Sequence, residues 1–273
     1  MLTTTTTRTG LLADLREIVD EQVVYRELLI QMTYRDLLLR YKQTVMGFAW
    51  AIFMPLVNTA MFSVIFMRVA PINTGVPYPL YAFSGLLAWN FFASSLRFAV
   101  ASLTSNASLI TKIYFPREIF PLSAVMVTLV DTIFGSLVLV ALMVYYHVSI
   151  GPALLLLPAV IAVEVMFTCA VALALAMANL FYRDIKYLLE LFITIWMFAT
   201  CVVYPIAFVG GRMGQVLRLN PMVAIIDAFR AVVIHGAAPD PVAFLGVALF
   251  SAVALVAAWV IFHRAEFAFA ENI

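Results

Sequence analysis

Long apolar runs separated by short polar breaks are the dominant pattern of this chain. A helix that crosses a bilayer needs about 20 consecutive, mostly apolar residues. Six runs satisfy this requirement, at residues 47–69, 80–103, 120–146, 152–181, 188–209 and 241–262. The pattern therefore predicts an all-α integral membrane protein, a single transmembrane domain over residues 1–273 with six membrane-spanning helices between residues 47 and 262.

Residues 10–33 predict a helix of another kind. Apolar side chains recur there at spacings of three and four residues, and charged side chains occupy the other positions. Such an amphipathic helix suits the membrane interface. Packing on a cytosolic partner is the alternative, and the sequence is compatible with both placements.

Two shorter segments predict helices that do not span. In the region 210–238, Asn220 can cap a helix, Pro221 suits its first turn, and Gly236 can end it. This helix is apolar, carries Asp227 and Arg230 three residues apart, and is expected to dip into the outer leaflet; a seventh crossing is the alternative. The region 105–118 predicts a second short helix, from Asn106 to about residue 113, between two spans.

Composition and charge placement strengthen the membrane assignment and give it an orientation. Hydrophobic residues make up 65% of the chain and charged residues 11%, against about 25% charged in soluble domains. Lys and Arg are enriched in cytoplasmic loops, and eleven of the sixteen fall before the first span, in the second and fourth breaks, and after the last span. Both termini are therefore expected in the cytoplasm. The net charge of +1 gives no indication of nucleic-acid binding.

No motif for bond chemistry is visible. The sequence lacks a GxxxxGK[ST] phosphate loop, HExxH, GxSxG and an EF-hand pattern. His147, His235 and His263 lie near span boundaries and are expected to be interfacial residues, so no metal site and no catalytic residue is assigned. Within the spans, Asp131 and Glu164 are compatible with either a proton relay or structural hydrogen bonding.

Aromatic side chains gather in the first and fifth spans. Phe48, Pro55, Thr59, Phe62 and Phe66 share a stripe of the first, and the fifth holds Phe192, Trp196, Phe198, Tyr204 and Phe208. Packing and interfacial anchoring explain such residues in many membrane proteins. The alternative is a channel lining, because aromatic rings stack on the C–H faces of sugars. Phe48, Thr59, Phe62, Phe66, Phe192, Trp196 and Tyr204 are the candidates.

Five segments together resemble one family, the membrane permease subunit of type 2 ABC exporters for cell-surface polysaccharides (O-antigen, capsule and teichoic acid). They are residues 35–55 (RDLLLRYKQTVMGFAWAIFMP), 83–92 (FSGLLAWNFF), 105–118 (SNASLITKIYFPRE), 179–187 (NLFYRDIKY) and 220–230 (NPMVAIIDAFR). They cover nearly the whole chain in the family's order. Cys201 departs from the pattern, because the family usually has proline there, which leaves the kink of the fifth span open.

The resemblance implies a homodimer in the bacterial inner membrane that encloses a channel, with two copies of a separate ATPase subunit beneath. ATP and Mg²⁺ would bind that partner, so this chain would be a transport subunit without a cofactor. The segment 10–33 would be the interface helix. ATPase coupling would involve Asn106, Leu109, Lys112, Tyr114, Arg117 and Glu118, and a periplasmic gate would include Asn220, Pro221, Asp227 and Arg230.

The substrate that the resemblance implies is a polysaccharide on polyprenyl pyrophosphate. Its anionic head group would need cations at the cytosolic entrance, and Arg35, Arg40 and Lys42 are candidates; setting the orientation is their alternative role. A permease for teichoic acid, small lipids or drugs is the alternative assignment. A proton-coupled transporter or a membrane enzyme agrees less well with the sequence.

Overall fold

The computed structural model describes the backbone of residues 11–42, 44–47, 49–69, 71–112, 115–149 and 151–266, and side chains from residue 16 onward. Within these ranges all regular structure is helical. Phe48 and Tyr114, which the sequence assigns to the channel and to ATPase coupling, lie outside the described residues.

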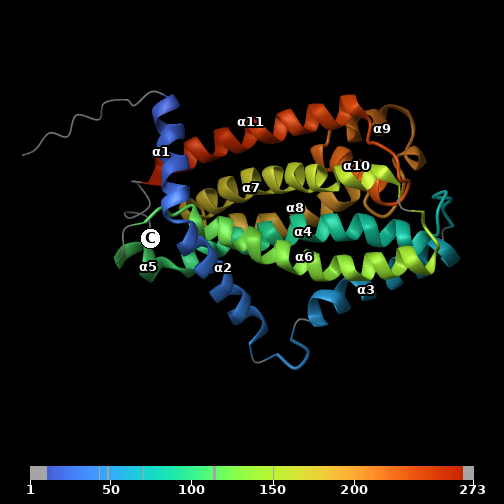
Figure 1. Cartoon of the computed structure of the whole chain (residues 1–273), viewed down its shortest axis with the longest axis horizontal. Coiled ribbons are helices and arrows are strands. Elements are labelled where there is room, and N and C mark those ends of the chain that lie inside the picture. Colours follow the sequence, from blue (N-terminus) through green and yellow to red (C-terminus); the bar gives the residue numbers. More distant parts are fainter. Residues whose placement is uncertain are drawn as a thin grey trace, which may run out of the picture.

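Four long helices run side by side and form the body of the molecule (Figure 1). They are α4 (Tyr78–Ser105), α6 (Ile119–Tyr145), α7 (Leu157–Phe181) and α11 (Pro241–Ala265). A 3₁₀ turn, η2 (Pro152–Leu156), leads into α7. The helix α4 packs against α6 and α7 and also against three further helices, α3 (Ala49–Val64), α8 (Ile185–Ala199) and α10 (Pro221–Val233). Because of these contacts, its Phe83, Phe92, Leu96 and Leu103 are fully buried. The bundle is therefore organised around α4.

The helix α3 (Ala49–Val64) packs against α4 and α6 through one face and leaves most of its surface uncovered. It continues as a π-helical turn, η1 (Ile65–Val69). With α3 and η1 counted together, five helices within the described part of the chain are long and apolar enough to cross a membrane. The all-helical membrane fold predicted from the sequence is confirmed, whereas the count of six spans is not.

The expected fifth span differs most from its prediction. We expected residues 188–209 to be helical, but α8 (Ile185–Ala199) begins earlier and ends after 15 residues. At about 1.5 Å per residue it is about 22 Å long, shorter than the hydrocarbon layer of about 30 Å. The backbone of Cys201 has φ of +54°, which an α-helix does not allow. The chain therefore leaves the helical path there and continues through turns to η3 (Ile206–Phe208).

The N-terminal interface helix was predicted as one element over residues 10–33. The structure instead has α1 (Leu11–Val24) and α2 (Arg26–Tyr41), separated by Tyr25, whose backbone leaves the helical range with φ −94° and ψ 12°. The break lets α1 lie steeply across the end of the bundle while α2 packs along α6 (Figure 1). One straight helix could not make both contacts.

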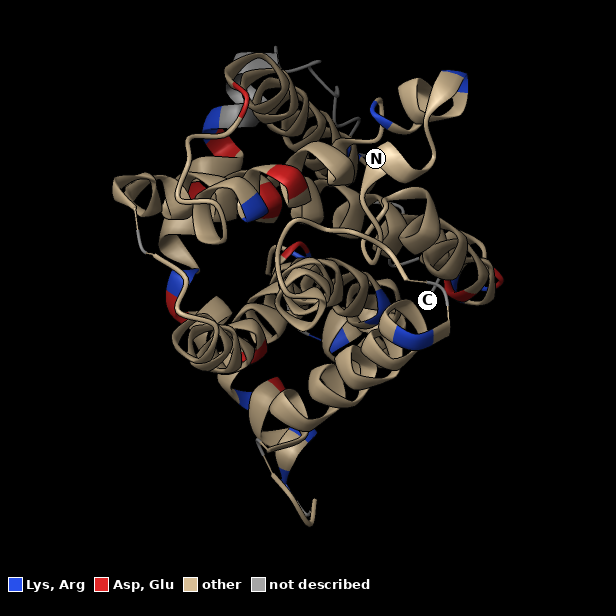
Figure 2. Cartoon of the chain, turned by 90° about the vertical axis from the view of Figure 1, so that its right-hand side faces the viewer, with Lys and Arg blue, Asp and Glu red and all other residues tan. Residues whose placement is uncertain are grey.

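Two groups of short helices mark the two ends of the bundle. The α5 end holds α5 (Ala107–Lys112), α1 and the end of α11, and the α9 end holds α9 (Gly211–Leu217) and α10 (Pro221–Val233) (Figure 1). Figure 2 looks along the helices from the α9 end, and most of the ribbon there carries no charge. The α5 end corresponds to the side where the sequence places most cations.

The helix α10 agrees with the prediction at both ends. Asn220 Oδ1 accepts a hydrogen bond from the backbone N–H of Met222 at 3.1 Å, so Asn220 is the N-cap of the helix. After Val233 the helix stops, and Gly236 adopts φ of +59°. An apolar, non-spanning helix in the region 210–238 is thus confirmed.

A buried guanidinium joins α10 to α4 and to the turn after α8. Arg230 is 4% exposed, and its Nη1 donates to the hydroxyl of Tyr81 at 2.9 Å. Its Nη2 donates to the backbone carbonyl of Val202. The α10 helix therefore depends on a charge whose partners all come from other elements. Room for this guanidinium exists because residue 85 is a glycine: a Cβ there would lie 2.2 Å from Arg230 Nη2 and 2.5 Å from Val202 O.

We predict that Gly85→Ala lowers the free energy of unfolding by about 1–3 kcal/mol, the usual range for overpacking a filled interior. Thermal unfolding of the purified protein in detergent measures the change. Gly246→Ala is the matched control, because a Cβ at Gly246 meets nothing within 4 Å. Equal unfolding temperatures for the two variants would contradict the packing of Arg230 against α4.

Candidate functional site

Two neighbouring cavities, at the α5 end and beside α2, hold most of the polar side chains that face a common space. The first has a volume of about 500 Å³ and is lined by Arg35, Arg40, Phe98 and Asn106, among others. The second is about 360 Å³ and lies between α3, α4 and α6. Arg40 lines both cavities. We call them together the polar crevice.

The lining of the second cavity is rich in hydrogen-bonding groups, and of these the sequence singled out only Arg40 and Asp131. Its polar and aromatic members are Arg40, Tyr41, Trp50, Asn58, Asn90, Ser94, Thr128, Asp131 and Thr132. Each lies within or beside an apolar run, so nothing in the sequence marks them as neighbours. In a chain with so few polar residues, their convergence on one space is the main feature of the site.

Arg40 and Asp131 form an ion pair at the junction of the two cavities. Arg40 Nη1 lies 2.5 Å from Asp131 Oδ2, and the Tyr41 hydroxyl donates to Asp131 Oδ1 at 2.5 Å. Burial and this hydrogen bond raise the pKa of Tyr41, so the phenol stays a protonated donor. The Arg40 guanidinium also lies over the Phe98 ring, 4.0 Å from its centroid. These contacts favour a structural role for Asp131.

Arg35 is likewise held by a carboxylate. Its Nη2 lies 2.7 Å from Asp36 Oδ1 and 3.1 Å from Asn106 Oδ1, which links α2 to the junction of α4 and α5. Asp36 also accepts a hydrogen bond from Ser123 on α6 at 3.3 Å. Two of the three expected head-group residues thus line the crevice with their charges paired, and the third, Lys42, is exposed. The crevice is close to neutral and offers hydroxyl, amide and aromatic surfaces.

A separate cavity at the α5 end is lined by two cations, Arg183 and Lys186. Its volume is about 330 Å³, and its other lining residues include Asn179, Thr104 and Ala107. In the sequence, Arg183 and Lys186 belong to the fourth break, whose cations indicate the orientation of the chain. Neither takes part in an ion pair among the described residues. This cavity therefore keeps more of its positive charge than the polar crevice does.

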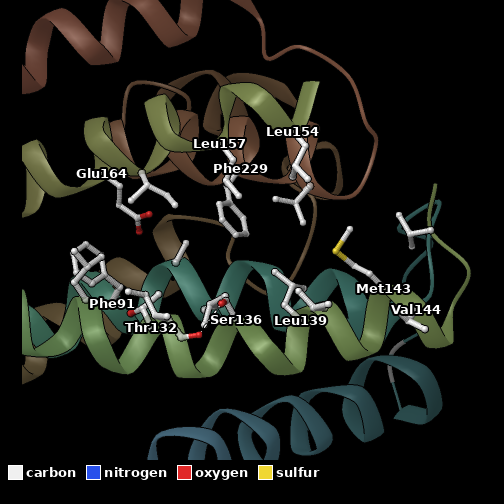
Figure 3. A pocket seen from close by; sticks show the side chains of 18 of the residues that line it. Phe91, Thr132, Ser136, Leu139, Met143, Val144, Leu154, Leu157, Glu164 and Phe229 are labelled. Atoms are coloured by element: carbon white, nitrogen blue, oxygen red, sulfur yellow. Dashed lines mark hydrogen bonds between the residues drawn. The ribbon is translucent and has the colours of Figure 1, made fainter. Parts of the chain in front are cut away.

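A further cavity has the opposite character. It has a volume of about 600 Å³, lies between α4, α6, α7 and α10, and is lined mainly by Leu, Val, Ile, Phe and Met. Figure 3 shows the carboxyl group of Glu164 pointing into it across from Phe91 and Thr132. Because Asp131 is bound to Arg40 and Glu164 points into a different cavity, a relay through both carboxylates has no support in this arrangement.

The expected channel stripe of the first span is present, but within one chain it faces inward. Thr59 is buried, and Phe62 and Phe66 pack against α4 residues. The Phe66 ring lies 5.5 Å from that of Tyr78. The uncovered face of α3 carries other residues, such as Phe53, Met54 and Met61. The channel role of the stripe stays a prediction.

The aromatic residues of the fifth span fall into two environments. Trp196 packs in a buried ring cluster 5.0 Å from Phe92, and its Nε1 donates to Asn220 Oδ1 at 3.1 Å. Phe192 is exposed on α8, and its ring lies 5.3 Å from that of Trp196. Tyr204 lies beyond the end of α8 and donates its hydroxyl to the backbone carbonyl of Phe198 at 2.5 Å. Trp196 therefore also positions the cap of α10.

The expected coupling region forms a short helix with one buried side and one free side. Ile110 is buried and Leu109 packs beneath it, whereas Ser108, Thr111 and Lys112 are exposed. The helix covers residues 107–112. The prediction that the Asn106 side chain caps this helix is wrong, because its amide donates back to Ser102 O at 2.8 Å.

The last two coupling candidates are tied to the C-terminal end of α11. Arg117 Nε lies 3.6 Å from Glu266 Oε1, and Glu118 is buried beside His263. Burial raises the pKa of Glu266 to about 7. Neither side chain is a free contact for a partner in this arrangement.

The four gate candidates lie in different environments. Asn220 caps α10 and Pro221 opens it, so both act on the helix itself. Asp227 is exposed, whereas Arg230 turns into the bundle. The sequence suggested that Asp227 and Arg230 interact along α10. In the structure the Arg230 guanidinium instead donates hydrogen bonds to Tyr81 and Val202.

Comparison with known proteins identifies the class. The ABC-2 type transporter family matches residues 27–234, and the chain belongs to this family. It is similar to the O-antigen export system permease protein RfbA of Myxococcus xanthus, with 30% identity over 259 residues that cover 94% of this chain and 99% of the relative.

Other relatives have matching descriptions. An O-antigen export system permease protein RfbA of Klebsiella pneumoniae is 30% identical over 214 residues, which cover 77% of this chain and 81% of that protein. The polysialic acid transport protein KpsM of Escherichia coli is 20% identical over 244 residues, covering 85% and 91%. The resemblance to polysaccharide-exporting ABC-2 permeases is confirmed. The chain is a membrane protein of the permease type, and membership of this family implies an ABC ATPase as partner.

Proposed function

We propose that two copies of this chain form the membrane conduit of an ATP-driven exporter. It moves a polysaccharide on polyprenyl pyrophosphate, of the O-antigen kind, out of the cytoplasm across the bacterial inner membrane. Both termini and the α5 end face the cytoplasm, and a separate ATPase pair binds ATP and Mg²⁺. The supporting observation is the polar crevice in a chain that belongs to the ABC-2 type transporter family.

The character of the crevice supports a glycan as cargo. Hydroxyl groups of a sugar lose much free energy on leaving water unless they find hydrogen-bond partners. Asn58, Asn90 and Ser94 offer such partners, and Trp50 offers an aromatic face beside them. The apolar cavity around Glu164 offers few, so it does not suit a hydrated polymer.

Pairing of two copies is supported by charges that lie on an outer face of the bundle. Arg97 on α4 and Glu190 on α8 form an ion pair at 3.0 Å, and their side chains are 39% and 57% exposed. An exposed ion pair on membrane helices is costly against lipid. A second copy of the chain or a hydrated seam between copies would remove that cost. We place the conduit at such a seam, with Phe192 of α8 beside it.

Energy would reach the permease through α5. This helix is anchored in the bundle by Ile110 and presents Lys112 outward. A short helix held on one side transmits displacement as a rigid body. Closure of the ATPase pair on ATP would therefore move the ends of α4 and α6, which α5 connects.

We predict that Lys112→Glu lowers ATP-dependent glycan export in proteoliposomes by about tenfold or more while the complex keeps its ATPase activity. A loss of about 1.4 kcal/mol in coupling free energy corresponds to a factor of ten. Arg212→Glu is the control, because it reverses another exposed positive charge, on α9 at the opposite end. Normal export by Lys112→Glu would exclude the coupling role of α5.

The pyrophosphate would meet cations at the α5 end. Arg35 and Arg40 would first have to leave Asp36 and Asp131, whereas Arg183 and Lys186 are free of such pairs. We therefore add Arg183 and Lys186 to the head-group candidates Arg35, Arg40 and Lys42, and rank the added pair first.

We predict that the double variant Arg183→Gln and Lys186→Gln weakens binding of a polyprenyl diphosphate to the purified complex by about tenfold or more. A hydrogen bond to a charged group contributes about 1.5–3 kcal/mol. Titration with the diphosphate and with the uncharged polyprenyl alcohol separates head-group from chain binding. The control replaces Arg35 and Lys42 by Gln. A larger loss in the control than in the double variant would contradict our ranking.

A further inference from the structure

Three elements from distant parts of the chain meet at one cluster of metal-ligating side chains at the α5 end. Glu21 comes from α1, Glu118 from the start of α6, and His263 from the end of α11. One ligand atom from each lies within 4.8 Å of the others. Nδ1 of His263 is 3.3 Å from Glu118 Oε1 and 3.9 Å from Glu21 Oε2. Sequence reasoning treated His263 as an interfacial residue and missed this cluster.

Glu118 is buried at this cluster, and His263 contacts only one of its two carboxylate oxygens. It is 1% exposed and precedes the first residue of α6, where a carboxylate would usually cap the helix, but it makes no capping hydrogen bond. Its Oε1 faces His263, while its Oε2 is buried without a hydrogen-bond partner among the described residues. A buried carboxylate oxygen without a partner carries a large desolvation cost. A cation beside it would remove that cost.

The spacing of the three groups suits a transition-metal ion. Zinc binds His nitrogen at about 2.0–2.1 Å and carboxylate oxygen at about 2.0–2.2 Å, usually as a tetrahedron, which puts two ligand atoms roughly 3.4 Å apart. The distance from His263 to Glu118 already agrees, at 3.3 Å. Glu21 Oε2 lies 3.9 Å from His263 Nδ1, about half an ångström beyond that tetrahedral spacing, and the three ligand atoms all lie within 4.8 Å of one another. Glu21 must therefore move closer, and its partly exposed position on α1 allows side-chain movement.

The second imidazole nitrogen of His263 also faces a carboxylate. Nε2 of His263 faces Glu17 Oε2 at 4.0 Å. Metal-bound histidines commonly donate their second N–H to a carboxylate, which fixes the orientation of the ring. Glu17 and Glu21 lie one helical turn apart on α1, so one helix supplies both the outer partner and a ligand. Arg117 lies close by, and its side chain and backbone N–H both contact Glu266.

We propose that Glu21, Glu118 and His263 bind one divalent transition-metal ion of the zinc class, with Glu17 as the positioning residue of His263. The ion joins α1 to the start of α6 and the end of α11. Ile18, buried at 3%, is the apolar contact of α1 at the same place. The site holds the N-terminal helix on the bundle at the α5 end. It is independent of the identity of the transported cargo.

Metal binding to the purified full-length chain, carrying an affinity tag without histidine and stripped with a chelator, tests the proposal. Titration with Zn²⁺ and elemental analysis should give one ion per chain. Co²⁺ should give a visible absorption spectrum typical of nitrogen and oxygen ligands. His263→Gln and Glu118→Gln should each weaken binding at least a hundredfold, and Glu17→Gln about tenfold to a hundredfold, as for other outer partners.

Matched variants keep the test decisive. His235→Gln removes an exposed histidine just beyond α10, near the α9 end, and should bind Zn²⁺ like the wild type. Glu21→Gln changes a partly exposed ligand on α1 and covers the case in which the buried variants fail to fold. Hydrogen exchange in residues 16–24 should slow when Zn²⁺ is added to the wild type and stay unchanged in Glu21→Gln. Less than one ion per wild-type chain, or equal affinity in the Glu21→Gln variant, overturns the proposal, whatever the result for export.

Discussion

A charged side chain inside a bilayer must find its partner within the protein or in water, and this constraint organises the molecule. Arg230 meets it with Tyr81 and the Val202 carbonyl, which attaches α10 to α4. Arg40 meets it with Asp131, which attaches α2 to α6. Arg97 and Glu190 pair with each other but stay exposed, so their side of the bundle needs a further covering. The charged groups thus show both how the helices are held and where the chain is incomplete alone.

The same constraint separates the cavities by function. The polar crevice gathers amide, hydroxyl and aromatic groups around a neutralised ion pair, and it begins beside α5. The larger apolar cavity resembles the lipid that surrounds the protein. A glycan with many hydroxyl groups has a use for the first and none for the second. The proposed conduit and the proposed coupling helix are therefore neighbours, which allows motion of one to change the other.

The sequence predicted the features that follow from local patterns, such as the long helices. It missed the features that depend on contacts between distant parts of the chain. Run length and caps predicted the long helices and the start of α10 at Asn220, because those signals are local. The break at Tyr25 and the early end of α8 at Cys201 depend on what each segment packs against. Arg230 looked like a partner for Asp227 on its own helix. The contact of His263 with Glu118 joins positions 145 residues apart, and the ring of polar groups around Asn90 is equally invisible to a linear reading.

The claim that the crevice is a hydrated path is tested most directly by the reactivity of single cysteines in the assembled exporter, after Cys169 and Cys201 are replaced by alanine. Ser94→Cys lines the crevice, whereas Val140→Cys lines the apolar cavity and has a more exposed side chain. The account predicts that a membrane-impermeant thiol reagent modifies Ser94→Cys rapidly and leaves Val140→Cys unmodified. Protection of Ser94→Cys together with labelling of Val140→Cys would contradict it.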